Sequence, residues 1–431
     1  MLKKLSQSDF TFDYWKSDLI AGVTVGIVAL PLALAFGITT GVGAGPGLVT
    51  AIIAGFLAAL LGGSRFQVSG PTGAMTVVLV PIVANHGPSA LVPVGVGAGI
   101  ALVLASILKL GNLVSRIPWS VMEGFTLGIA MVIGLQQIPM ALDIPKAHGT
   151  HTVSVAFNTL KNGIHRGLSF NAFVILFTSL LIKFATPHIL KKMKIKFFIP
   201  GSFTTVVVMT IACWNISVPD VGSLPVGIFK FQMSELNKGE MGLLALFGAI
   251  IAIAALGGIE SLLSARVADQ MAHHRELSQM QPNHELFGQG IATIAASLFG
   301  GMPATGAIAR TSVNVRAGGS TRLSAMIHAI FLLIIYFVLS PLIAHVPSGA
   351  LAAILIGTSW KMANPREIIE QLRTTKTEAI TFLATALSVL FIDLIWGIAI
   401  GLSLIHISEP TRRRGIESKR QLQLSTRSIL K

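Results

Sequence analysis

The feature that most constrains this chain is a series of long segments that are apolar and almost free of charge. Hydrophobic residues make up 52% of its 431 residues and charged residues 12%, and the mean hydropathy is +0.75. A helix needs about 20 apolar residues to cross the hydrocarbon core of a bilayer; some runs are that long, and others are shorter or broken by Gly and Pro. The runs are 18–40, 47–62, 71–86, 90–108, 119–142, 169–185, 198–214, 241–264, 285–300, 321–345, 348–359 and 377–405. We therefore expect an all-α polytopic membrane protein with about twelve to fourteen membrane segments.

The formal net charge of +14 is distributed as a topology signal. Clusters of Lys and Arg precede the first run and follow the even-numbered runs, as at Lys16, Lys109 and Lys191. Under the positive-inside rule these clusters are cytoplasmic, which puts residues 1–17 in the cytoplasm and the loops 143–168 and 215–240 outside. No aromatic-plus-basic motif or zinc-ligand spacing accompanies the charge, so we expect no nucleic-acid partner.

Motifs that would indicate an enzyme are missing from the sequence. It contains no HExxH, no GxSxG and no Walker-type phosphate loop, so we predict that the chain is not an enzyme, that it has no cofactor and that it carries no ATP-driven motor of its own. A single cysteine, Cys213, excludes an intramolecular disulfide.

Two short stretches share a pattern that is unusual inside apolar runs. SGPTGAMTVVLV at 69–80 and MPATGAIARTSV at 302–313 both place Thr-Gly-Ala just after a proline and before a helix-compatible run. Each copy opens the third span of a seven-span half, as expected of an internal repeat in a transporter. Because seven is odd, the second half enters the membrane from the opposite side, so the predicted fold is a 7+7 inverted repeat with two broken half-helices.

Broken helices from inverted halves would bring two helix N-termini together near the bilayer midplane. Each N-terminus carries unbonded backbone N–H groups and about half a positive charge, so the pair would form an anion site. Gly70, Gly73 and Gly306 would let the backbone approach the ion, and Thr72 and Thr305 would donate hydrogen bonds. The alternative is that these residues only break the helices and pack tightly.

Two charged side chains fall within or beside these segments. Arg310 lies within two turns of the second helix start, where a guanidinium faces a cavity or a partner unless it reaches the cytoplasmic surface beside Arg316. Glu260 is the acidic residue of the eighth span, and Ser264 lies one helical turn further on. Glu260 could pair with Arg310, bind a coupling cation such as sodium together with Ser264, carry a proton, or remain a protonated structural carboxyl.

Five segments, in order, resemble the hallmark segments of the sulfate permease (SulP) family. They are DLIAGVTVGIVALPLALAFGI (18–38), QVSGPTGAMTVV (67–78), IESLLSARVADQM (259–271), NHELFGQGIA (283–292) and FGGMPATGAIARTSVNVRAG (299–318). The family includes sulfate transporters, bicarbonate transporters and animal anion exchangers, and the resemblance extends from residue 10 to about residue 402.

This resemblance implies fourteen segments within a transporter domain at 18–402. A core domain would comprise about 18–110 and 243–345, and a gate domain about 119–214 and 348–402. Family members move the core against the gate like an elevator, and many are homodimers. The family's anion pocket carries over to Phe36, Thr72, Gly73, Ala309 and Arg310 of this sequence.

Two departures bear on the substrate and on coupling. Pro31 is followed by Leu32, where many members have Gln, so the pocket lacks one polar group. Sodium-coupled bicarbonate members carry Asp and Thr where this chain has Glu260 and Ser264, although a carboxylate and a hydroxyl could still bind sodium. We favour proton or sodium symport over exchange, and sulfate, bicarbonate, chloride and small dicarboxylates all remain open as substrates.

The end of the chain departs from the family most. After residue 402 the sequence SLIHISEPTRRRG interrupts the expected last span, and a STAS domain, which usually follows, is missing. We expect residues 403–431 to be a non-native tail; the alternative is a native basic tail that binds lipid.

Together these observations predict a secondary active transporter of inorganic anions in the cytoplasmic membrane. A nucleobase permease of the same fold and an uncoupled anion channel are the alternatives. Inhibition by nucleobases would favour the permease, and failure to accumulate solute against its gradient would favour the channel.

Overall fold

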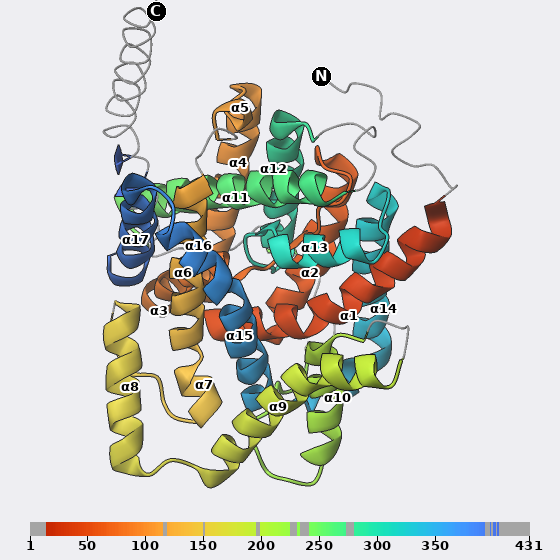
Figure 1. Ribbon diagram of the computed structural model, residues 1–431, viewed down its shortest axis with the longest axis vertical. Helices are drawn as coiled ribbons and strands as arrows, with labels where there is room; N and C mark the ends of the chain where they lie inside the picture. The colour runs from red at the N-terminus through yellow and green to blue at the C-terminus, as the bar shows by residue number, and fades with distance from the viewer. Residues whose placement is uncertain are drawn as a thin grey trace, which may run out of the picture. The chain divides into compact units, whose positions relative to one another are not determined.

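The computed structural model consists mainly of α-helices of very different lengths (Figure 1). It describes residues 14–114, 119–149, 151–194, 199–224, 231–232, 241–272, 280–392, 397, 400–401 and 403–404, so most of the expected non-native tail lies outside the described residues. The elements are α1 (Trp15–Thr40), α2 (Ala44–Leu61), β1 (Ser69–Gly70), α3 (Gly73–His86), the 3-10 helix η3 (Pro88–Ala90), α4 (Leu91–Ile107), α5 (Gly111–Val114), α6 (Trp119–Gln136), α7 (Ile138–Leu142), α8 (Thr152–Arg166), α9 (Phe170–Lys192), α10 (Gly201–Ala212), α11 (Leu243–Met271), α12 (Pro282–Leu298), β2 (Thr305–Gly306), α13 (Ile308–Arg316), α14 (Arg322–Ala344), α15 (Ser348–Met362), α16 (Pro365–Leu372) and α17 (Lys376–Phe391).

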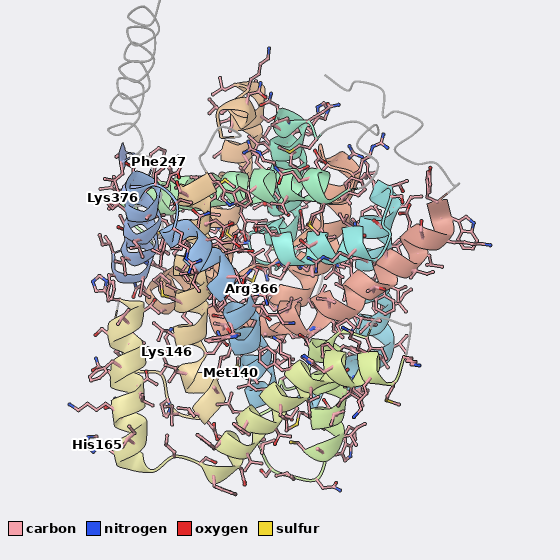
Figure 2. The ribbon with its side chains drawn as sticks, viewed as in Figure 1. Met140, Lys146, His165, Phe247, Arg366 and Lys376 are labelled. Atoms are coloured by element: carbon pink, nitrogen blue, oxygen red, sulfur yellow. The ribbon has the colours of Figure 1, made fainter. Side chains whose placement is uncertain are left out.

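Within the described residues, seven helical segments are long and apolar enough to cross a membrane. They are Trp15–Thr40, Ala44–Leu61, Pro88–Ile107, Trp119–Leu142, Phe170–Lys192, Leu243–Met271 and Arg322–Ala344. The apolar helices α3 and α10 are shorter. Large apolar side chains are exposed on these segments, including Phe177, Phe247 and Phe337, which are 64–68% exposed (Figure 2 labels Phe247). Such surfaces suit lipid rather than water, and the predicted all-α polytopic membrane fold is confirmed.

The chain divides into two compact units. One comprises residues 1–116 and 133–359, and the other residues 117–132 and 360–431. All the predicted site residues belong to the first unit. These bounds reflect packing rather than motion, so the division into a core and a gate domain stays a prediction.

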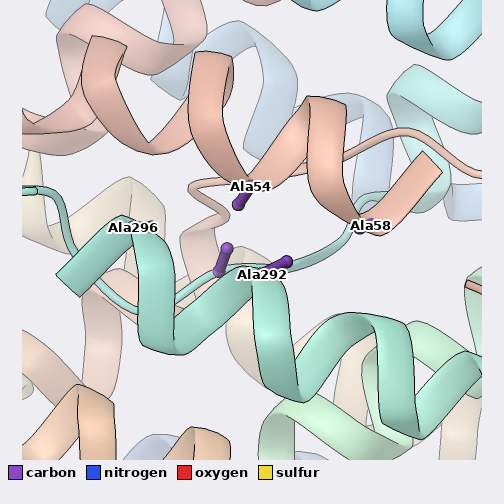
Figure 3. Close-up of a cluster of buried hydrophobic side chains, with 5 residues drawn as sticks. Ala54, Ala58, Ala292 and Ala296 are labelled. Carbon is purple, nitrogen blue, oxygen red and sulfur yellow. The ribbon is translucent and has the colours of Figure 1, made fainter. Parts of the chain in front are cut away.

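Small residues allow the helices of the first unit to pack closely. Ala54 and Ala58 of α2 meet Ala292 and Ala296 of α12 in a cluster in which every side chain is at most 5% exposed (Figure 3). Where α1 meets α2, a Cβ added to Gly47 would lie 2.1 Å from the carbonyl oxygen of Ala33. Small side chains at such crossings let membrane helices gain dispersion energy at short range.

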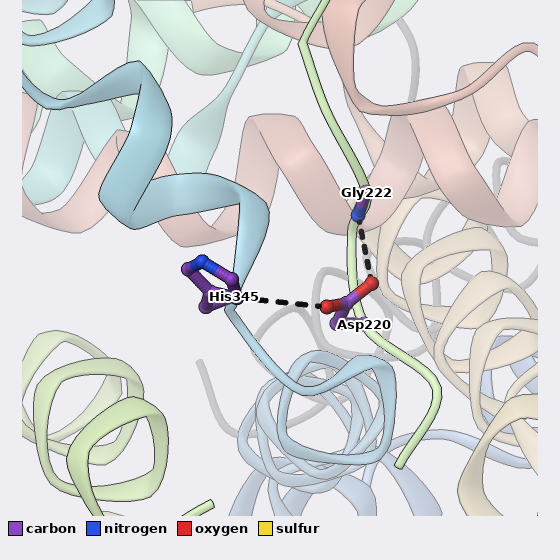
Figure 4. A network of polar contacts seen from close by, with 3 residues as sticks. All are labelled: Asp220, Gly222 and His345. Atoms are coloured by element: carbon purple, nitrogen blue, oxygen red, sulfur yellow. Dashed lines mark hydrogen bonds and ion pairs between the residues drawn. The ribbon is translucent and has the colours of Figure 1, made fainter. Parts of the chain in front are cut away.

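The loop segment at residues 219–222 is hydrogen-bonded to the junction of α14 and α15. Val221 and Gly222 donate their backbone N–H groups to the carbonyls of Val346 and Ala344 at 3.0 and 3.1 Å. His345 Nδ1 lies 3.9 Å from Asp220 Oδ2, and Asp220 Oδ1 accepts from the Gly222 N–H at 3.1 Å (Figure 4). These bonds satisfy the backbone of a loop segment that the sequence assigns to the outside.

Gly47→Ala should destabilise the protein, because the added methyl group would meet rigid backbone of α1. Overpacking of this kind costs about 1–3 kcal/mol. The measurement is the temperature at which half of the detergent-solubilised protein stays monodisperse. Gly248→Ala in α11 is the matched control, since its added Cβ meets nothing within 4 Å. Equal temperatures for the two variants would contradict the close packing of α1 against α2.

Candidate anion and coupling site

The two copies of the Thr-Gly-Ala pattern lie side by side. β1 pairs with β2 in antiparallel register, with Ser69 opposite Gly306 and Gly70 opposite Thr305. Helix α3 begins three residues after Gly70, and α13 begins two residues after Gly306. Both helix N-termini therefore follow directly from two extended segments, residues 62–72 and 299–307, which cross where β1 pairs with β2.

The first turns of α3 and α13 supply backbone amides that have no partner within their own helices. In α3 these include Gly73 and the next residue; the Thr72 hydroxyl accepts from the Met75 N–H at 3.3 Å and so caps the helix. In α13 the cap residue is Ala307, two residues after Thr305. Ala309 in the first turn of α13 is exposed, so this helix start is open. The arrangement can bind an anion through backbone N–H groups.

Phe36 of α1 borders the start of α3. Its side chain is 7% exposed, and a Cβ added to Gly73 would lie 3.4 Å from Phe36 Cε1. The same added Cβ would lie 2.0 Å from Ile133 Cδ1, so a side chain at this position would have to displace Ile133. Gly73 thus brings the backbone of α3 against an apolar wall that contains Phe36.

Glu260 of α11 joins the two copies of the pattern. Its Oε2 accepts a hydrogen bond from the Thr72 hydroxyl at 2.9 Å and from the Thr305 hydroxyl at 2.5 Å. The two hydroxyl oxygens are 3.0 Å apart, and Thr72 and Thr305 are 5% and 0% exposed. One carboxylate oxygen and two hydroxyl oxygens therefore converge where the two extended segments of the chain cross.

Arg310 points toward the other copy of the pattern. The side chain is 1% exposed, and its Nη2 donates to the Pro71 carbonyl at 2.9 Å. Gly70 (φ +150°) lies so close that a Cβ there would be 2.7 Å from Arg310 Nη1. Glu260 attracts Arg310 electrostatically, but the carboxylate is hydrogen-bonded to the two threonines. Arg310 thus stays inside the protein rather than reaching the surface near Arg316.

The structure places Ser264 with partners other than Glu260. Its hydroxyl donates to Thr311 Oγ1 at 3.0 Å, and the Val68 N–H donates to the same oxygen at 3.1 Å. Ser261 accepts from the Gly306 N–H at 3.0 Å, so the amide of this predicted site residue is bonded within the protein. Ser261 and Thr311 were not predicted as site residues, although each directly follows one in the sequence, Glu260 or Arg310.

One face of α11 therefore binds both crossing segments, with Glu260 at its centre. The oxygen atoms suit a hard cation or a proton, and the helix starts suit an anion. Within the described part of the chain, no cluster of three His, Cys, Asp or Glu side chains could hold a metal ion. A site of this kind inside a helical membrane protein defines a class, the multi-pass solute transporters with broken helices.

Comparison with known proteins identifies the family. The sulfate permease family model matches residues 15–385, and the chain belongs to the sulfate permease family. The protein YvdB of Bacillus subtilis, for which sulfate transport is a provisional assignment, is 37% identical over 423 residues, covering 94% of this chain and 76% of YvdB. The bicarbonate transporter BicA of Picosynechococcus is 28% identical over 421 residues, covering 94% of this chain and 72% of BicA.

A solved structure gives the same result for the fold. The transmembrane domain of a cyanobacterial bicarbonate transporter BicA superposes with a TM-score of 0.79 at 27% identity, covering 92% of this chain and 99% of that domain. The chain is thus a multi-pass membrane transporter of the anion-transporting sulfate permease family and not an enzyme.

Thr305→Val should reduce uptake of labelled sulfate or bicarbonate into vesicles by at least about tenfold, because a hydrogen bond to a charged group contributes about 1.5–3 kcal/mol. Valine keeps the shape but removes the donor to Glu260. Thr24→Val is the control, since the buried Thr24 hydroxyl bonds only locally to the Ile20 carbonyl, at 2.7 Å. If the two variants transport equally, the hydroxyl of Thr305 has no part in the site.

Proposed function

We propose that the protein is a secondary active transporter of an inorganic anion of the sulfate or bicarbonate class, which it carries across the cytoplasmic membrane. The observation that carries this proposal is the antiparallel pairing of β1 with β2, which sets the starts of α3 and α13 beside Glu260. Family membership, the bicarbonate transporter BicA and the provisional sulfate assignment of YvdB support the substrate class.

The anion would bind to the first-turn amides of α3 and α13. Gly73 and Ala309 mark these two turns, and Phe36 borders the first of them. The partial positive charge of both helix N-termini would attract the anion, and the buried Arg310 would add a full positive charge nearby. The bond from Nη2 to the Pro71 carbonyl would hold the guanidinium in place. The buried Nη1, which has no hydrogen-bond partner among the described residues, would then be left to bind the anion.

Coupling would take place at Glu260. Both threonine hydroxyls donate to its Oε2, so the carboxylate already gathers two further oxygen atoms around it. A sodium ion could bind there if the hydroxyls rotated to present lone pairs, and the ligands would then be Glu260, Thr72 and Thr305. Alternatively, a proton could bind to the carboxylate itself. Either cation would offset the charge of Glu260 beside the anion.

We further propose, from the family resemblance, an elevator motion of the core against the gate and a homodimeric assembly. The distribution of Lys and Arg supports a cytoplasmic N-terminus. A cytoplasmic N-terminus would place the loops 143–168 and 215–240 outside the cell.

The central experiment is uptake into liposomes that contain the purified protein. Labelled sulfate and labelled bicarbonate are each supplied with and without an inward sodium or proton gradient. Accumulation of one anion, driven by one cation, would establish both the substrate and the coupling ion. Equal leakage of both anions, indifferent to either gradient, would instead indicate a channel and refute coupled transport.

Arg310→Ala should weaken anion uptake by at least about tenfold while membrane insertion stays intact, because the removed charge lies in a site shielded from water. Arg316→Ala is the matched control, since Arg316 is the exposed arginine at the end of the same helix. Wild-type uptake by a well-folded Arg310→Ala protein would remove this residue from the site.

Glu260→Gln should abolish the dependence of uptake on sodium or on pH, because glutamine can neither ionise nor neutralise a cation. Initial rates are measured across a range of sodium concentrations and pH values. Glu370→Gln on the exposed surface of α16 serves as the control. A variant at position 260 that keeps its cation dependence would contradict the coupling role.

A further inference from the structure

Three polar side chains on α12 form a buried row. Glu285, Gln289 and Thr293 are spaced four residues apart, so they share one face of the helix. Their side chains are 1%, 0% and 1% exposed. Polar groups inside a membrane protein are costly unless they are hydrogen-bonded, so the partners of this row indicate its purpose.

Glu285 holds the segment that leads from α2 to β1. Its Oε2 accepts from the backbone N–H groups of Gly63 and Ser64, each at 2.8 Å, and its Oε1 accepts from Gln67 Nε2 at 2.7 Å. The Gln67 side chain in turn lies against Gly306, where an added Cβ would be 2.0 Å from Gln67 Nε2. Glu285 therefore acts on the first crossing segment and, through Gln67, reaches the second.

Gln289 bonds to both crossing segments with one amide group. Its Oε1 accepts from the Ser69 hydroxyl in β1, and its Nε2 donates to the carbonyl of Ala304, which precedes β2; both bonds are 2.8 Å long. Thr293 donates to the same carbonyl at 3.4 Å. An amide supplies a donor and an acceptor at once, which neither a carboxylate nor an apolar side chain can do.

The backbone of α12 is itself firmly held. Ala292 and Ala296 pack against α2 in the alanine cluster of Figure 3. Where α12 meets α4, a Cβ on Gly290 would be 2.7 Å from the carbonyl oxygen of Gly99. The row therefore projects from a helix that has little freedom to shift.

We propose that the row of Glu285, Gln289 and Thr293 positions the anion and coupling site by fixing the spacing of the two crossing segments, so that Thr72 and Thr305 meet on Glu260. These are positioning residues, since their hydrogen bonds go to residues 63–69 and 304 rather than to Glu260. The effect on transport rests on the function proposed above; the effect on spacing does not.

The spacing is tested first, by a measurement that needs no transport. In a Cys213→Ala background, Thr72→Cys and Thr305→Cys form a pair whose native oxygens are 3.0 Å apart, close enough for a disulfide to form under mild oxidation. Gln289→Leu should slow its formation by at least about fivefold. Ser297→Ala, one helical turn beyond the row on α12, should leave the rate unchanged, because its buried hydroxyl has no hydrogen-bond partner among the described residues. An unchanged rate with Gln289→Leu would overturn the proposal.

Transport kinetics then separate positioning from general damage. With labelled sulfate and bicarbonate as probes, Gln289→Leu and Glu285→Leu should raise the apparent KM about tenfold and change the maximal rate less than twofold. Glu285→Gln should largely restore the KM, because the Gln67 amide can turn its buried Oε1, which has no hydrogen-bond partner among the described residues, toward the new donor. A fall in the maximal rate alone, or no rescue by Glu285→Gln, would refute positioning through hydrogen bonds.

The two proposals can fail separately. If Gln289→Leu slows disulfide formation while Glu260→Gln keeps full cation dependence, the positioning role stands and the coupling role of Glu260 fails. If Glu260→Gln loses its cation dependence while the disulfide forms at the original rate in Gln289→Leu, coupling stands and the positioning role fails.

Discussion

Backbone that leaves the helical conformation inside a membrane must find hydrogen bonds within the protein, and the rest of this structure depends on that constraint. Water is absent from the hydrocarbon, so each unbonded N–H or carbonyl costs several kcal/mol. Residues 62–72 and 299–307 are two such segments, each lying between two helices. They meet part of the requirement by pairing with each other as β1 and β2. Side chains supply much of the remainder.

Side chains of two helices, α11 and α12, form hydrogen bonds with these segments. Glu260, Ser261 and Ser264 of α11 bond to the two threonines, to the Gly306 amide and to Thr311. The row on α12 bonds to residues 63–69 and to Ala304. Hydrogen bonds from side chains of both helices thus fix the positions of both extended segments. A site preorganised in this way loses little free energy to ordering when an ion binds.

Much of the fold could be predicted from the sequence. Runs of apolar residues indicated an all-α membrane protein, and five motifs indicated the sulfate permease family; both predictions are confirmed. The repeated Thr-Gly-Ala pattern predicted two helix starts close together, and the structure places them at one crossing. The inverted repeat and the division into core and gate stay predictions.

The site was predicted less completely. Glu260 was selected because a carboxylate in an apolar span is rare, but its partners are the two threonines, and Ser264 bonds to Thr311 instead. Arg310 was expected either to face a cavity or a partner or to reach the surface; it is buried, and its guanidinium bonds to the Pro71 carbonyl. Gln289 lies within one of the five family segments but was not predicted as a site residue. A polar residue in one sequence does not reveal which distant segment it contacts.

The sequence by itself determined the solvent, the helical class and the identity of the two broken segments, because hydrophobicity and helix-breaking residues act locally along the chain. Only the tertiary structure decided which hydroxyl, amide and carboxylate groups meet. Ser69 and Gln289 are 220 residues apart in sequence, and Thr72 and Glu260 are 188 apart. Hydrogen bonds of this kind require donor and acceptor atoms to be placed to within a few tenths of an ångström. The packing of α2, α11 and α12 sets these positions, and no local sequence pattern contains them.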